Sequence, residues 1–236
     1  MPDGTKLRQA EVWSPGRRAT TPNAITILSS NRKPKLKSIG RWVLGISLLL
    51  VVTLGGFLIF TAATHNLHTV SDGKVYRAAQ MDGAALNRVI SEKGIKTIIN
   101  LRGSGGDQDW YRAETNAAAQ GGAEHYDFSL SASKEVDDRM MEQIVATLER
   151  APKPVLIHCK NGADRSGLVG ALYLYCLEGK PADAADKQLT MLYGHVPYLF
   201  WRDTIAMDRS FWRYVSNHVQ TPGLKAPKDD KPISKN

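Results

Sequence analysis

A single uncharged apolar run divides this chain of 236 residues into parts that face different surroundings. Residues 42–64, WVLGISLLLVVTLGGFLIFTAAT, contain no charged side chain. A helix needs about 20 apolar residues to cross the roughly 30 Å hydrocarbon layer of a membrane. A cleaved signal peptide has a shorter apolar core, of about 7–15 residues, close to the N-terminus. The run therefore predicts one transmembrane helix, with cleavage after the small residues at 61–63 as the alternative.

The positive charge of the chain is concentrated before this run. The net charge is +8, and residues 1–41 carry nine lysine or arginine side chains against two acidic ones. The remainder is close to neutral, so the composition does not favour a nucleic-acid-binding surface. Because basic flanks of a membrane span stay in the cytoplasm, we expect a single-pass anchor with a cytoplasmic N-terminus. Residues beyond 64 then lie on the far side of the membrane, which is the periplasm in a bacterium.

The two ends of the chain lack the periodicity of helices and strands. Residues 1–41 contain scattered prolines among basic and polar side chains, and residues 221–236, TPGLKAPKDDKPISKN, have a similar composition. Such segments bury too little apolar surface to fold. We expect a disordered basic leader that lies against anionic lipid, and a disordered tail.

Residues 65–220 contain apolar segments of two alternating kinds. The runs at 95–101 and 155–158 are typical of strands buried on both faces, whereas the apolar spacing at 137–150 and 166–178 is typical of helices. Alternating strands and helices predict an α/β fold with a central, mostly parallel sheet flanked by helices. We therefore expect one folded domain between the membrane anchor and the tail.

The stretch LIHCKNGADRSG joins a predicted strand to a predicted helix. A loop in this position leaves backbone N–H groups unpaired at the positive end of a helix, which favours an anion. Cys159 starts the loop, where the helix end and Arg165 both favour the thiolate form. Arg165 presents a planar fork of donors that matches two phosphate oxygens. The residues expected to line the bound phosphate are Lys160, Asn161, Gly162, Ala163 and Ser166.

The segment HCKNGADRSG resembles the His-Cys-x5-Arg-Ser/Thr signature of the protein tyrosine phosphatase superfamily, nearest to its dual-specificity and bacterial branches. VYRAAQ and GIKTIINLRG also resemble segments of those branches, so the likeness covers roughly residues 70–195. The resemblance implies the cysteine-phosphatase fold and phosphoryl transfer through a cysteinyl-phosphate on Cys159, without a metal or other cofactor. Arg165 would hold the phosphate oxygens. Ser166 would donate a hydrogen bond to the sulfur, or cap the following helix.

The general acid is where the sequence departs from the family pattern, which places an aspartate about 30 residues before the cysteine. Asp127 has nearly that spacing but lies inside a predicted strand, 124–130, and alignment by the flanking elements puts Ala132 at the position of the acid. Asp164, within the loop, is favoured by the resemblance to some bacterial phosphatases, and an ion pair that orients Arg165 is its structural alternative. Glu135 is a third candidate, and the usual acid can also be absent.

Four other side chains have a functional and a structural interpretation. Arg77 and Arg102 would assist substrate binding or form salt bridges. His158 would orient the loop from beneath or be an ordinary core histidine, and Cys176 is expected to pack inside a helix.

The substrate class has two candidates. The family suggests a phosphorylated protein, of tyrosine or dual specificity. The predicted topology favours a lipid or glycan phosphate of the cell envelope, because ATP and hence phosphoproteins are scarce outside the cytoplasm. The alternative to an enzyme is a catalytically silent phosphate-binding module.

Overall fold

The computed structural model describes residues 36–198 and 203–218, and the chain divides into two units at residues 49 and 50. Helix α1, Leu36–Ala63, contains a stretch, Gly40–Ala63, that is long and apolar enough to cross a membrane by length and composition. This confirms the predicted apolar helix. Its insertion and its orientation remain predictions. Most of the expected leader, 1–41, and all of the expected tail, 221–236, lie outside the described residues.

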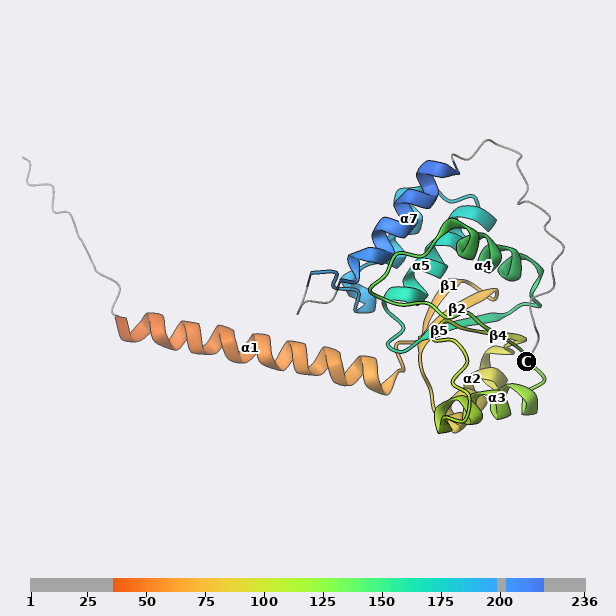
Figure 1. Ribbon diagram of the computed structural model, residues 1–236. Helices are drawn as coiled ribbons and strands as arrows, with labels where there is room; N and C mark the ends of the chain where they lie inside the picture. The colour runs from red at the N-terminus through yellow and green to blue at the C-terminus, as the bar shows by residue number, and fades with distance from the viewer. Residues whose placement is uncertain (1–35, 199–202, 219–236) are drawn as a thin grey trace, which may run out of the picture. The chain divides into compact units, whose positions relative to one another are not determined.

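Five strands form one mixed sheet, as Figure 1 shows. Their order across the sheet is β1-β2-β5-β3-β4, with only the β1–β2 pair antiparallel. The strands are β1 His68–Ser71, β2 Val75–Ala79, β3 Thr97–Asn100, β4 Glu124–Asp127 and β5 Val155–Cys159. The predicted α/β fold with a mostly parallel central sheet is therefore confirmed. In this order β5 is the central strand, and all five of its residues are buried.

Helices cover both faces of the sheet (Figure 1). Helices α2, Gly83–Lys93, and α3, Asp109–Gln120, pack against one face, where the buried cluster includes Ile98 and Leu156. The next residues along the same strands, Ile99 and Ile157, point to the opposite face. Both faces of β3 and β5 thus carry buried apolar side chains, as expected for strands covered by helices on both sides.

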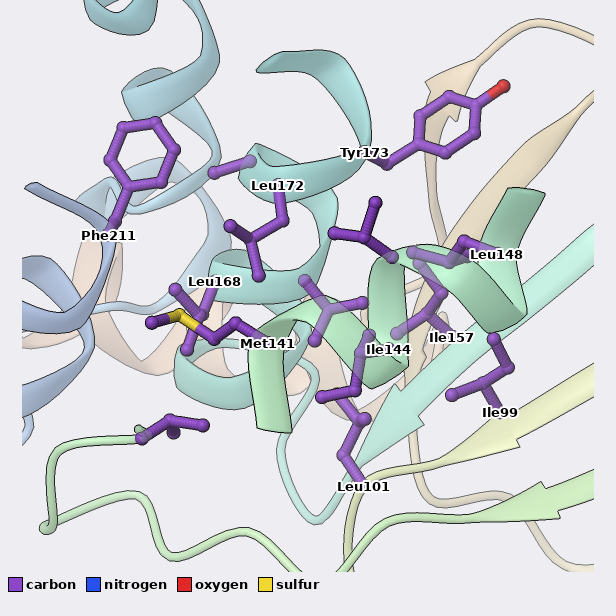
Figure 2. Packing of buried hydrophobic residues seen from close by; sticks show 14 of the residues in the cluster. Ile99, Leu101, Met141, Ile144, Leu148, Ile157, Leu168, Leu172, Tyr173 and Phe211 are labelled. Atoms are coloured by element: carbon purple, nitrogen blue, oxygen red, sulfur yellow. The ribbon is translucent and has the colours of Figure 1, made fainter. Parts of the chain in front are cut away.

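The opposite face carries the larger core. Helices α4, Asp138–Arg150, α5, Asp164–Leu172, and α7, Ile205–Asn217, contribute to it. Figure 2 shows side chains of α4, such as Ile144 and Leu148, together with those of the strands and of α5. Met141, Ile144 and Leu148 are fully buried, which matches the amphipathic pattern of the sequence.

Short elements lead from α5 to α7. They are the π-helical turn η1, Tyr173–Leu177, helix α6, Ala182–Ala185, and two 3-10 turns, η2 Asp186–Gln188 and η3 Met191–Tyr193. The sequence predicted one continuous helix as far as residue 178, whereas α-helical geometry ends at Leu172 and continues as η1.

Two other boundaries differ from expectation. Strand β4 stops at Asp127 instead of residue 130, although the chain continues beside β3 through hydrogen bonds from the N–H groups of Phe128 and Leu130. Helix α5 begins at Asp164 instead of residue 166. Arg165 therefore lies in the first turn of the helix, and only residues 160–163 remain as the connection between β5 and α5.

Candidate active site

The connection between β5 and α5 passes against the backbone of β2. Gly162 has a φ of +69°, and a Cβ atom at this position would lie 2.6 Å from the Ala78 carbonyl carbon and the Ala79 nitrogen. Only glycine fits both the left-handed conformation and the close approach. We call residues 159–165 the cradle loop. Cys159, the last residue of β5, begins this loop and is 2% exposed.

Arg77 of β2 holds the outer side of the cradle loop. Its Nη2 donates to the carbonyl oxygens of Gly162, at 2.8 Å, and Ala163, at 2.7 Å. Its Nη1 donates to the backbone oxygen of Gln188 at 2.6 Å, and the ring of Tyr193 lies 4.4 Å from the guanidinium. Burial lowers the pKa of Arg77 to about 10, so the side chain remains charged at neutral pH. Arg77 thus binds carbonyls of the loop, and it forms no salt bridge with the described residues.

The other two carbonyl oxygens of residues 160–163 accept hydrogen bonds from two further donors. The Gln80 N–H donates to the Lys160 oxygen at 3.3 Å, and Asn66 Nδ2 donates to the Asn161 oxygen at 2.9 Å. Within the described part of the chain, the N–H groups of residues 160–163 donate no hydrogen bond. With its carbonyls bonded outward, the connection is left with unpaired N–H groups at the N-terminus of α5. This arrangement can hold an anion.

Arg165 is fixed at one edge of its guanidinium. Nη1 donates to the carbonyl oxygens of Leu101 and Leu130, each at 3.2 Å, so the ends of two neighbouring segments of the sheet position the side chain. Its Nε is buried and has no hydrogen-bond partner among the described residues. A buried charged donor without a partner is costly unless a ligand accepts from it. Ser166 Oγ is also buried without a partner in the described structure.

A buried carboxylate supports the loop from below. Glu114 of α3 accepts hydrogen bonds from His158 Nε2 at 3.0 Å, His125 Nε2 at 2.8 Å and Gln80 Nε2 at 2.6 Å. Burial alone would raise the pKa of Glu114, but the hydrogen bonds from these three side chains outweigh it and lower the pKa to about 2. His158 is therefore a buried histidine whose Nε2 links β5 to α3, while its Nδ1 has no hydrogen-bond partner among the described residues.

Arg102 adds a second guanidinium close to Arg165. Its Nη1 donates to Gln80 Oε1 at 3.0 Å, and its guanidinium stacks 3.6 Å from the ring centroid of Trp110. Burial and then the positive charge of Arg165 lower the pKa of Arg102. Repulsion between two guanidinium groups is relieved when an anion binds beside both. Arg102 thus lies beside Arg165, and the repulsion between their charges is what a group in an anion site would show when no anion is bound.

The three candidate acids lie in different surroundings. Asp127 accepts from Asn100 Nδ2 at 2.7 Å and from the Tyr111 hydroxyl, so both carboxylate oxygens are engaged at the end of the sheet. Glu135 forms an ion pair with Arg213 of α7. Both carboxylates therefore have structural partners.

Asp164 is the carboxylate that belongs to the cradle loop. It is buried, and its Oδ1 accepts from His195 Nδ1 at 2.7 Å, while His195 Nε2 donates to Asp208 at 2.9 Å. Burial alone would lower the pKa of His195, but the hydrogen bonds to the two carboxylates raise it to about 9. The expected ion-pair alternative, Asp164 with Arg165, is replaced by this pairing with a histidine.

No sequence pattern indicated four of the side chains that support the site. Asn66, Glu114, His195 and Asp208 lie far from the signature in sequence and carry no local motif. One available signal was a polar residue inside an apolar helical pattern, as at Glu114 among alanines.

Both cysteines, Cys159 and Cys176, are free. Burial raises the pKa of Cys176 to about 11, which fits the expected packing position. In residues 36–198 and 203–218 no three His, Cys, Asp or Glu side chains are grouped so as to hold a metal ion.

We predict that Arg77→Lys lowers the affinity of the protein for inorganic phosphate, measured by isothermal titration calorimetry. A lysine cannot reproduce the planar fork that joins Gly162, Ala163 and Gln188. Each buried acceptor left unpaired should also cost about 1–3 kcal/mol of stability, measured by urea unfolding. Arg88→Lys, at an exposed position of α2, is the matched control. Equal phosphate affinities for the two variants would contradict the role of Arg77.

Several solved structures resemble this chain at low sequence identity. The structure of P. aeruginosa TpbA is 23% identical with a TM-score of 0.49, and the match covers 65% of this chain and 92% of that chain. PTPMT1 is 14% identical with a TM-score of 0.46, covering 65% and 98%. The PP-IP phosphatase SIW14 from S. cerevisiae is 17% identical with a TM-score of 0.47, covering 66% and 94%. Likenesses at this level do not assign a substrate.

A comparison with curated proteins gave no match. A family model, described as the tyrosine phosphatase family, matches residues 54–193, which is more than half of the chain. The match includes β5, the cradle loop and α5. The chain belongs to the tyrosine phosphatase family.

Proposed function

We propose that the protein is a cysteine-dependent phosphatase that hydrolyses phosphate monoesters through a cysteinyl-phosphate intermediate. The observation that carries this proposal is the cradle loop itself. Directly after Cys159, all four carbonyls of residues 160–163 are bonded outward, and the buried Nε of Arg165 lacks a partner among the described residues. This arrangement suits a phosphate group placed against the cysteine sulfur.

In the first step the Cys159 thiolate attacks phosphorus, and the bond from phosphorus to the leaving oxygen breaks. The N–H groups of Lys160, Asn161, Gly162 and Ala163, together with Arg165 Nε, would hold the other phosphate oxygens as charge shifts. Groups that are already in place need little reorganisation during the reaction, which is the main source of such electrostatic stabilisation.

In the second step water attacks the phosphorus of the cysteinyl-phosphate and gives a proton to the Asp164 carboxylate, while the sulfur–phosphorus bond breaks and the thiolate leaves. The buried hydroxyl of Ser166 lies in the first turn of α5, so it is available to donate a hydrogen bond to the departing sulfur. Inorganic phosphate is then released. The chemistry uses side chains and backbone donors of this chain alone.

We assign the general acid to Asp164. Both oxygens of Asp127 are engaged at the end of the sheet and Glu135 pairs with Arg213, whereas Asp164 lies in the cradle loop and accepts from His195 through one oxygen, Oδ1. The hydrogen bond from His195 Nδ1 leads directly to Asp164 Oδ1. A proton on the other carboxylate oxygen of Asp164 would pass to the leaving oxygen. The resulting carboxylate would stay hydrogen-bonded to the protonated His195, which Asp208 holds from its other side.

We also propose that the enzyme is a single-pass membrane protein, with residues 42–64 as the anchor, 65–220 as the catalytic domain and the N-terminus in the cytoplasm. The length of α1 supports the anchor, and the excess of basic side chains before it supports the orientation. The domain would then face the periplasm in a bacterium. Phosphorylated proteins and envelope lipid or glycan phosphates are the candidate substrates.

The test of the proposed function is hydrolysis of p-nitrophenyl phosphate by the purified full-length protein in detergent. Cys159→Ser should reduce turnover to the background, because a hydroxyl is a far weaker nucleophile than a thiolate. Cys176→Ser, at the other free cysteine, should leave turnover unchanged. Phosphate binding without turnover by the parent protein would favour the binding module instead.

Asp164→Asn should slow hydrolysis in a manner that depends on the leaving group. For alkyl phosphates, whose alkoxides need a proton, we expect a loss in kcat of about 10²–10⁴-fold. For p-nitrophenyl phosphate, whose leaving group departs as an anion, the loss should be much smaller. Asp127→Asn and Glu135→Gln are the matched comparisons, and the same leaving-group dependence in either one would move the acid to that residue.

A further inference from the structure

Exposed apolar side chains gather on the segment 189–198, beside the cradle loop. Met191 is 71% exposed, Leu192 77% and Tyr198 83%. Outside α1, the only other large hydrophobic side chain that is exposed in the described structure is Trp212, at 43%. An open hollow in the same segment is lined mostly by apolar side chains, including those of Leu189, Val196 and Pro197. A concentration of this kind marks an interaction surface.

This segment is tied to the end of α1. Asn66 Nδ2 donates to the backbone oxygen of Tyr193 at 3.0 Å, and the Asn66 N–H donates to the backbone oxygen of Thr61, in the last turn of α1, at 2.9 Å. One residue therefore bridges the end of the apolar helix and the turn η3. The ring of His68 also contacts the ring of Tyr193, with centroids 4.9 Å apart.

The same asparagine is tied to the cradle loop. Asn66 Nδ2 also donates to the Asn161 oxygen at 2.9 Å. On the other side of the segment, His195 lines the hollow and contacts Asp164 at 2.7 Å. The exposed turn, the end of α1 and the phosphate-binding loop are thus fixed to one another by short hydrogen bonds.

We propose that residues 191–198 lie in the surface of the bilayer that α1 crosses, so that the cradle loop receives its phosphate group from a membrane lipid. This inference rests on the proposed function and names its substrate class. If α1 spans the membrane, its last turn lies at the hydrocarbon boundary, and the turn η3 follows within one bridging residue of it. Apolar side chains at such a position enter the boundary between headgroups and acyl chains, and tyrosine is enriched there.

A bilayer fits this surface better than a soluble protein does. The exposed apolar side chains adjoin the candidate membrane span, and their burial in lipid would remove apolar surface from water. A phosphate on a lipid headgroup would reach the cradle loop without leaving the membrane surface.

The test places a fluorescent label at position 192. The full-length Cys159→Ser/Cys176→Ser chain with Leu192→Cys is labelled with an environment-sensitive nitrobenzoxadiazole dye and reconstituted into phosphatidylcholine vesicles. We expect blue-shifted emission that is quenched by nitroxide-labelled lipids. The same label at Arg88→Cys, on α2, should report water and resist quenching. A water-like signal at position 192 would overturn the proposal, as would a blue shift that depends on protein concentration and not on the lipid quencher.

A second measurement tests the substrate class with active protein. Met191→Asp/Leu192→Asp should lower turnover of phosphatidic acid in vesicles about tenfold or more, and leave turnover of p-nitrophenyl phosphate unchanged. Met191→Leu/Leu192→Met, which keeps the apolar surface, should match the parent on both substrates. Equal losses on both substrates, or no loss on either, would contradict the bilayer role.

The parent protein separates the two levels of the proposal. If it hydrolyses p-nitrophenyl phosphate but not phosphatidic acid, the lipid substrate is wrong and the phosphatase stands. If it hydrolyses neither, the proposed function fails, while the labelled chain still decides whether residues 191–198 contact lipid.

Discussion

The site depends on a buried guanidinium that binds the outer side of a loop. A connection such as residues 160–163 can present its N–H groups to an anion only if its carbonyls point elsewhere, and buried carbonyls need donors. Arg77 supplies two of them, and it can do so from the interior of the molecule because Gln188 and Tyr193 surround the rest of its side chain. A short polar side chain in β2 would leave the cradle loop with unpaired acceptors.

Basic and acidic side chains around the cradle loop are separated: arginines lie near the proposed anion site and carboxylates lie deeper in the fold. Arg165 and Arg102 are the two guanidinium groups of the proposed anion site, and the pKa of Arg102 is lowered by burial and by the charge of Arg165. Behind them lie two buried acidic centres, Glu114 with its histidines and the Asp164–His195–Asp208 chain. The negative charge of these two centres balances the positive charge of the nearby arginines. The proposed site would therefore carry little net buried charge when no phosphate is bound.

Local patterns in the sequence predicted much of this arrangement. The β-branched run of β3, the amphipathic α4 with Asp137 as its N-cap, and the strand, loop and helix around Cys159 all follow from periodicity and turn chemistry. These features depend on neighbours in the chain. The serine at position 166 is typical of a helix cap and predicts a start for α5 two residues later than the structure shows.

Contacts between distant segments were beyond such patterns. Asn66 reaches the Asn161 oxygen across 95 positions of sequence, and His195 reaches Asp164 across 31. An arginine in the sequence suggests a substrate contact or an acidic partner, whereas Arg77 donates to three backbone oxygens and to the side-chain amide oxygen of Gln188, all distant in the chain. The connection between the end of α1 and the turn η3 likewise emerges only when the chain is folded.

The central claim is that phosphate is transferred to one sulfur in the cradle loop. Rapid acid quenching of the parent protein during turnover of a ³²P-labelled phosphomonoester, followed by peptide mass spectrometry, tests it most directly. The account predicts a labelled peptide that carries phosphate on Cys159. Steady turnover without any adduct on this cysteine, or with the phosphate on another residue, would contradict it.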